Sequence, residues 1–147
     1  MMESQPDVSG PTILLVEDSP EDLRILRRAL KRAGMDFPIL HFEQGEDALR
    51  FLQRQSPAED RPSLIMLDVN LPGIDGLEIL RLLKADDRLQ QIPVIMLTTT
   101  VDEHEVLECY RLGANSFIRK PLEFDQFVEQ MRRMHAFWFG LATLPQE

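Results

Sequence analysis

The stretch LIMLDVNLPGIDGLEIL, residues 64–80, contains the features that decide the fold. Its first four residues, Leu64–Leu67, are an uninterrupted apolar run, which is typical of a short strand buried on both faces. Asp68 follows this run directly, and Leu-Pro-Gly at 71–73 marks a turn. Asp75 and Glu78 have the three-residue spacing of a capping box, which predicts that a helix begins near residue 76. The stretch therefore predicts a buried strand, a polar turn and a helix.

The same alternation extends along the chain in both directions. Short apolar runs predict five strands, at Thr12–Val16, Phe37–Phe42, Leu64–Leu67, Ile92–Leu97 and Asn115–Arg119. Segments of helical periodicity predict helices at 20–33, 45–54, 76–85, 103–112 and 123–141. Strict alternation predicts a parallel sheet with helices on both faces, and the units are too few for a β/α barrel. We predict an α/β, flavodoxin-like, doubly wound sheet of five strands in the order 2-1-3-4-5, with an extended C-terminal helix.

Length and charge restrict the class of protein. The 147 residues suit one domain, which we place at 12–141, between a flexible lead-in (1–11) and a tail (142–147). The 16 basic and 25 acidic residues give a net charge of −9, which disfavours binding to nucleic acid or to an anionic membrane. A single cysteine cannot form an internal disulfide. We find neither a secretory signal nor an apolar run of the ~20 residues that span a bilayer, so we expect a cytoplasmic protein.

Polar residues follow the predicted strands at the edge where such sheets bind ligands. Glu17 and Asp18 follow the first strand, Asp68 the third, Thr98 the fourth and Lys120 the fifth. Carboxylates packed together repel one another, and a hard divalent cation such as Mg²⁺ removes that conflict. A lysine and a threonine hydroxyl could hold a phosphoryl oxygen beside them. The pattern favours phosphoryl transfer with a carboxylate as the nucleophile.

Four stretches together resemble the response-regulator receiver domain. They are LLVEDSPEDLRILRRAL (14–30), LIMLDVNLPGIDGLEIL (64–80), PVIMLTTT (93–100) and GANSFIRKP (113–121), and the resemblance covers about residues 12–135. It implies a stand-alone response regulator of a two-component phosphorelay, which accepts a phosphoryl group from a histidine kinase in a Mg²⁺-dependent reaction. Such a protein is a switch that phosphorylates and dephosphorylates itself, and it is not a turnover enzyme.

The resemblance also assigns roles to individual residues. It implies that Asp68 is the phosphoacceptor, and that Glu17, Asp18, Asp68 and the backbone carbonyl of Asn70 hold the Mg²⁺. Thr98 and Lys120 would contact the phosphoryl group once it is present. Phe117 matches the position of an aromatic switch that turns inward when Thr98 moves.

The expected partners are a sensor histidine kinase or a phosphotransfer protein and a second copy of the chain. The last predicted helix is longer than the sheet requires, and its end has four apolar side chains: Phe137, Trp138, Phe139 and Leu141. We predict a homodimer through the face of the fourth helix, fifth strand and fifth helix. The alternative is that the tail folds back over these rings. The ending FWFGLATLP (137–145) resembles the small stand-alone regulators of phytochrome-type histidine kinases.

Two other functions remain open at this point. A Mg²⁺-dependent phosphatase of the haloacid dehalogenase type would use an aspartyl nucleophile, but that family needs a second Asp where this chain has Asn70. A pseudo-receiver, which binds partners without being phosphorylated, usually lacks one of the residues that are present here. The sequence identifies neither the kinase and its stimulus, nor the downstream target, nor the lifetime of the acyl phosphate.

Overall fold

A computed structural model describes residues 12–54, 61–71, 73–99, 102–120 and 123–141. The sheet has five parallel strands: β1 (Ile13–Val16), β2 (Ile39–Phe42), β3 (Leu64–Asp68), β4 (Val94–Thr98) and β5 (Ser116–Arg119). Their order is β2-β1-β3-β4-β5, as predicted. The helices are α1 (Pro20–Arg32), α2 (Gly45–Arg54), α3 (Gly76–Ala85), α4 (Glu103–Arg111) and α5 (Phe124–His135), followed by the π-helix η1 (Ala136–Leu141).

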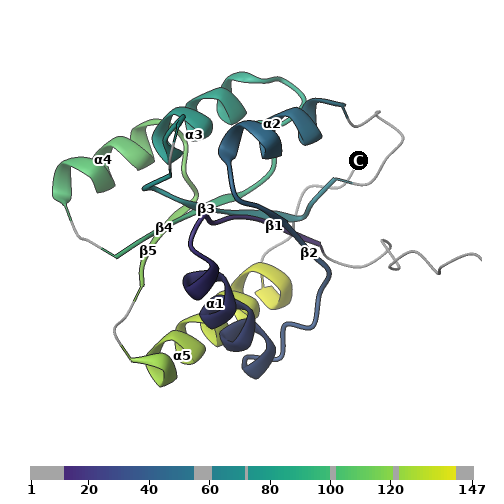
Figure 1. The fold of residues 1–147 in the computed structure, drawn as a ribbon, viewed down its shortest axis with the longest axis vertical. Helices are drawn as coiled ribbons and strands as arrows, with labels where there is room; N and C mark the ends of the chain where they lie inside the picture. Colours follow the sequence, from purple (N-terminus) through teal and green to yellow (C-terminus); the bar gives the residue numbers. More distant parts are fainter. Residues whose placement is uncertain (1–11, 55–60, 72, 100–101, 121–122, 142–147) are drawn as a thin grey trace, which may run out of the picture.

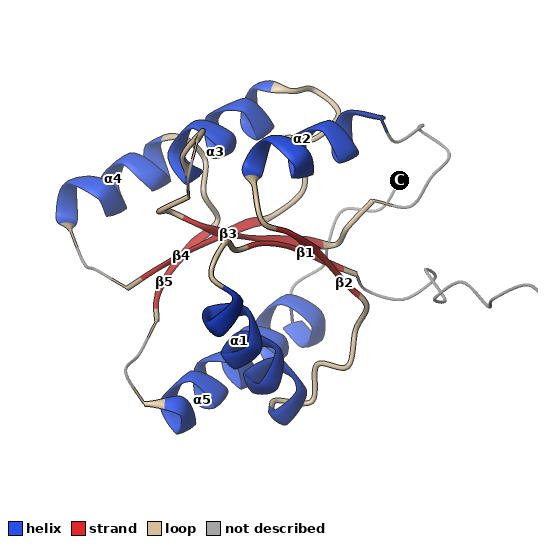
Figure 2. Ribbon diagram, viewed as in Figure 1, coloured by secondary structure: helices blue, strands red, loops and turns tan. Residues whose placement is uncertain are grey.

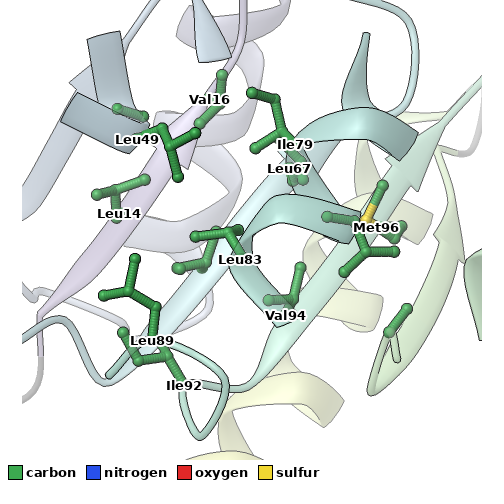
Figure 3. Close-up of a cluster of buried hydrophobic side chains, with 14 of the residues drawn as sticks. Leu14, Val16, Leu49, Leu67, Ile79, Leu83, Leu89, Ile92, Val94 and Met96 are labelled. Carbon is green, nitrogen blue, oxygen red and sulfur yellow. The ribbon is translucent and has the colours of Figure 1, made fainter. Parts of the chain in front are cut away.

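The helices lie in two layers, one on each face of the sheet. Figure 1 shows α2, α3 and α4 on one side and α1 and α5 on the other, and Figure 2 shows the sheet between them. Each face has its own apolar core. Leu14, Leu67, Val94 and Met96 point toward α2 and α3 (Figure 3), while Leu15 and Met66 pack with residues of α1 and α5. Strands β1, β3 and β4 are buried on both faces, which explains their uninterrupted apolar sequences.

The predicted helix starts are confirmed by side-chain caps. The Ser19 hydroxyl accepts a hydrogen bond from the Asp22 amide, and the Asp75 carboxylate accepts one from the Glu78 amide. Asp102 also caps its helix, where its carboxylate accepts a hydrogen bond from the His104 amide at 2.9 Å. In the described part of the chain no helix has the length and apolar character that a membrane crossing requires.

The last helix differs from the prediction of one regular helix over 123–141. The α-helix ends at His135, and a π-helix continues to Leu141, whose side chain is outside the described residues. Phe137 is 48% exposed. Phe139 is covered by Phe37, with ring centroids 4.9 Å apart.

Phe37 was predicted to begin the second strand, but it lies in the loop before β2 and packs on the end of the chain's last helix. Trp138 is half-buried against the α1–α5 core. Phe139 is therefore covered within the chain by a loop, and Phe137 is the most exposed of the three rings. The tail 142–147, which was the alternative cover, is outside the described residues.

Candidate functional site

The carboxyl ends of four strands bring the predicted site residues to one edge of the sheet. Glu17 and Asp18 follow β1, Asp68 ends β3, Thr98 ends β4 and Lys120 follows β5. The strands are in register, with Val16 beside Leu67 and Asp68 beside Leu97. Parallel neighbours in this register end at the same level, so that side chains far apart in sequence meet.

The three acidic side chains form one cluster. Carboxylate oxygens of Glu17, Asp18 and Asp68 all lie within 4.8 Å of one another. Glu17 is 1% exposed and Asp68 is 6% exposed, whereas Asp18 is exposed. Two of these carboxylates have therefore lost most of their hydration, and the third faces solvent at the mouth of the site.

Lys120 reaches into this cluster from the end of β5. Its Nζ lies 2.7 Å from Glu17 Oε1, 3.0 Å from Asp68 Oδ2 and 3.3 Å from Asp22 Oδ2. Its side chain is 11% exposed. The Lys120 amide also donates to the Thr98 carbonyl at 2.6 Å, which fixes the start of the loop after β5 against the end of β4. One ammonium thus contacts three carboxylates, and negative charge remains in excess.

Burial and this excess charge perturb the titration of the site. Burial raises the pKa of the Glu17 carboxyl from its usual 4.5 to about 7, although the hydrogen bond and the charge of Lys120 oppose that rise. Burial also disfavours the charged form of Lys120. Its hydrogen bond to Glu17 and the charge of Asp68 outweigh burial, and the pKa of Lys120 lies above its usual value. Lys120 is therefore protonated at neutral pH, while Glu17 loses its proton less readily than an ordinary carboxyl group.

The loop after β3 holds the Asp68 carboxylate by its backbone. The Asn70 amide donates to Asp68 Oδ1 at 2.9 Å. The loop then returns to the end of β3, where the Gly76 amide donates to the Val69 carbonyl at 3.0 Å. A Cβ at Gly76 would lie 2.2 Å from the Asp68 carbonyl oxygen, so this return path requires glycine. Asn70 is exposed, and the role of its carbonyl as a metal ligand stays a prediction.

Thr98 and Phe117 lie on neighbouring strands and on the same face of the sheet. Thr98 is fully buried at the end of β4. Phe117 pairs with Met96, two residues before Thr98, so its side chain lies on the face of Thr98 and one pleat further from the site. Phe117 is half-buried and packs against the α2–α3 core. This placement is compatible with the predicted switch pair.

The structure adds residues that sequence reasoning did not assign to the site. Asp22, an acidic residue in the first turn of α1, contacts Lys120. No local pattern marks it, because its partner Lys120 lies 98 residues away in the sequence. Glu46, in the first turn of α2, accepts a hydrogen bond from the Ile74 amide at 3.5 Å. His41 of β2 bonds the Glu17 carbonyl at 2.8 Å.

A pocket of about 480 Å³ opens beside Lys120, between α1 and α5. It gives this side of the site a partly apolar wall, and its lining residues are Asp22, Ile25, Leu26, Thr99, Arg119, Lys120, Glu123, Gln126, Phe127 and Gln130. A phosphoryl donor that approaches Lys120 from this side would meet both apolar and charged groups.

The donor set fits a hard divalent cation. Oxygen ligands from three carboxylates in one cluster are the type that Mg²⁺ and Mn²⁺ accept, and the single ammonium does not balance their charge. Glu17, Asp18 and Asp68 are the residues that would hold the ion.

Comparisons with known proteins agree with this geometry. The sequence model described as "Response regulator receiver domain" matches residues 13–132. Response regulator Rcp1 of Synechocystis sp. is 38% identical over 143 residues, which span 95% of this chain and 97% of Rcp1.

Solved structures give the same result. The crystal structure of the phosphorylated cyanobacterial phytochrome response regulator RcpA matches with a TM-score of 0.84 at 33% identity, over 92% of this chain and 99% of RcpA. The crystal structure of the Mn(2+)-bound form of Rcp1 matches with a TM-score of 0.82 at 36% identity, over 93% of this chain and 100% of that chain.

Proposed function

This chain belongs to the response regulator receiver domain family and is closely related to phytochrome response regulators, and from that premise we propose that Asp68 accepts a phosphoryl group from a histidine kinase. The donor would be a phosphohistidine on the kinase, for which we propose the phytochrome type, or on a phosphotransfer protein. Phosphorylation would then change a protein-interaction face. A cytoplasmic location stays a prediction from the sequence.

The observation that carries this proposal is the environment of the Asp68 carboxylate. It is almost fully buried, yet one oxygen accepts a hydrogen bond from the Asn70 amide and the other lies 3.0 Å from Lys120 Nζ. Attack by an Asp68 oxygen on the phosphorus atom forms the acyl phosphate, and the P–N bond of the donor breaks as its histidine keeps the electron pair. The Lys120 ammonium is placed to neutralise charge on a phosphoryl oxygen attached to Asp68.

We propose Mg²⁺ as the cation, held by Glu17, Asp18, Asp68 and the Asn70 carbonyl. When bound, Mg²⁺ would neutralise negative charge on the phosphoryl oxygens. The Thr98 hydroxyl would donate to a phosphoryl oxygen and Phe117 would follow its movement, because the two residues share one face of adjacent strands. Hydrolysis of the acyl phosphate returns the site to rest, so the protein acts as a switch and not as a turnover enzyme.

For the interaction face we propose the surface of α4, β5 and α5 with η1, and a second copy of the chain as an occupant. Three exposed apolar side chains support it: Leu107 (53%), Tyr110 (49%) and Phe137 (48%). Tyr110, Phe117, Phe137 and Trp138 are among the residues that line a hollow of about 410 Å³ on this face. Because Phe117 lies in its wall, movement of Phe117 would change the shape of the surface.

The alternatives are less favoured. The family match extends over residues 13–132, and Asn70 occupies the place where a haloacid dehalogenase-type phosphatase needs its second Asp. The acceptor, the acidic pair and the lysine are all present, with Lys120 in contact with Glu17 and Asp68 and with Asp18 close by, whereas pseudo-receivers usually lack one of these residues.

The test is phosphorylation by acetyl phosphate with Mg²⁺, followed by intact mass. We expect the wild type to gain one phosphoryl group and Asp68→Asn, or wild type with EDTA, to gain none. The matched control is Asp75→Asn on the same loop, because asparagine caps helices as well as aspartate does, and this variant should still be labelled. Beryllofluoride, a mimic of the phosphoryl group, provides a second arm. If neither reagent reacts at Asp68, the binding module without phosphorylation is the better explanation.

A further inference from the structure

A side chain of strand β2 forms a hydrogen bond with the backbone of the acidic pair, Glu17 and Asp18. His41 lies on β2 at the edge of the sheet, and its Nε2 is 2.8 Å from the carbonyl oxygen of Glu17. A carbonyl oxygen can only accept, so Nε2 carries the hydrogen and donates it. We propose that His41 is a positioning residue for the cation site, which orients Asp18 by holding the peptide bond between Glu17 and Asp18. This inference rests on the proposed function only in taking Glu17, Asp18 and Asp68 as cation ligands.

Regular sheet pairing between β1 and β2 stops just before this contact. The last strand pair in register is Val16 with Phe42, and the Glu17 amide still donates to the Phe42 carbonyl at 3.0 Å. Beyond that bond the Glu17 carbonyl receives its hydrogen bond from the His41 ring. His41 pairs with Leu15, so its side chain lies on the same face of the sheet as Leu15. The imidazole therefore continues the connection between the two strands where main-chain pairing ends.

Every polar group of Glu17 takes part in a hydrogen bond or an ion pair, and Asp18 differs from it in this respect. Glu17 Oε1 contacts Lys120, and Glu17 Oε2 accepts from the Ser19 amide at 3.3 Å. Among the described residues, no hydrogen bond or ion pair holds the exposed Asp18 carboxylate. The backbone consequently determines where the Asp18 side chain starts, and the peptide plane that precedes it carries the carbonyl that His41 holds. Residues that hydrogen-bond directly to a metal ligand typically change metal affinity by 10–100-fold when they are removed, and we expect His41, which acts through the backbone, to lie at the lower end of that range.

The experiment measures Mn²⁺ binding by the full chain, with the dissociation constant obtained from the electron paramagnetic resonance signal of free Mn²⁺. His41→Phe keeps a planar ring without a donor, and we expect it to raise the dissociation constant about tenfold. His41→Gln places an amide donor at similar reach and should restore binding to within about threefold of the wild type. If His41→Phe does not fold, His41→Met takes its place. Methionine has the same length as glutamine but no hydrogen-bond donor, so His41→Met can be compared directly with His41→Gln.

A control separates positioning from general destabilisation. Asn115 Oδ1 accepts a hydrogen bond from the Val94 amide at 2.9 Å, at the opposite edge of the sheet. Asn115→Ala should lower the urea midpoint and leave Mn²⁺ affinity within about twofold of the wild type. At saturating Mn²⁺, His41→Phe should label with acetyl phosphate at close to the wild-type rate, while the Mn²⁺ concentration for half-maximal labelling rises about tenfold.

The outcomes are distinguishable. Wild-type affinity in His41→Phe, or an equal loss in Asn115→Ala, overturns the positioning role and leaves the proposed function standing. Absence of Mn²⁺ binding by the wild type overturns both. A tenfold loss that His41→Gln restores supports both.

Discussion

The buried Glu17 carboxyl should make the folded protein less stable as the pH rises, and Glu17→Gln should remove that dependence. Glu17 is almost fully buried, and burial raises its pKa to about 7. The folded state therefore holds a proton at this group at pH values where the unfolded chain has lost it. Glutamine has nearly the same shape and its side-chain oxygen can still accept from Lys120, but it does not titrate.

The size of the effect follows from the two pKa values. A carboxyl with a pKa of 4.5 in the unfolded chain and about 7 in the folded state favours folding fully below pH 4.5, and this contribution disappears as the pH passes 7. The full shift of 7 − 4.5 = 2.5 corresponds to about 3 kcal/mol. Between pH 5 and pH 8 the free energy of unfolding should fall by about 2–3 kcal/mol from this group alone.

The assay is urea unfolding with EDTA at pH 5 and at pH 8, for the wild type and Glu17→Gln. The other titrating groups are common to both proteins, so the difference between the two slopes reports Glu17. We expect the wild type to lose about 2–3 kcal/mol more than the variant over this interval. Saturating Mg²⁺ at pH 8 should restore stability to the wild type and much less to the variant, because a ligand stabilises the state that binds it. Parallel slopes for the two proteins in EDTA would refute the reasoning.

Three further predictions concern the site and its surroundings. Lys120→Met leaves two buried carboxylates, Glu17 and Asp68, without their ammonium partner. In EDTA its free energy of unfolding should be about 3 kcal/mol lower than that of the wild type, and Mg²⁺ should restore part of this loss. Its labelling by acetyl phosphate should be at least about tenfold slower. Gly76→Ala places a methyl group against the Asp68 carbonyl, so we expect it to lower the free energy of unfolding in urea by about 2 kcal/mol or more. A decrease below about 0.5 kcal/mol would contradict this close approach. Phe139→Ala should lower stability by about 1–2 kcal/mol because it removes the contact with Phe37, whereas Phe137→Ala should change stability by less than about 0.5 kcal/mol and weaken self-association in sedimentation.

Sequence reasoning succeeded where local pattern and sheet topology determine position. Asp68 and Lys120 are 52 residues apart, yet each follows a segment that the alternation of strands and helices assigns to one parallel sheet. The carboxyl ends of such strands meet, so the contact between these two residues was predictable. Ser19 and Asp75 were predictable as caps because the first turn of a helix has unpaired amides that a nearby side chain can accept from.

The features that the sequence did not predict depend on contacts between distant segments. His41 resembles any other residue of a half-buried strand, and its role follows from the place where β1 and β2 stop pairing. Phe37 continues the apolar run of the second strand, but the loop after α1 carries it to Phe139. The π-helix over Ala136–Leu141 has no local signal that we can identify, and the structure offers no physical reason for it.

Charge balance connects the resting site to the phosphorylated one. At rest, one ammonium faces the carboxylates of Glu17, Asp68 and Asp22, with Asp18 close by. Phosphorylation of Asp68 would replace a single negative charge by about two. The same Lys120 would then face a larger excess of negative charge, which a divalent cation relieves more in the phosphorylated state than at rest. Because coupling between two ligands is reciprocal, a cation that favours phosphorylation must itself bind more tightly to the phosphorylated protein, by the same factor.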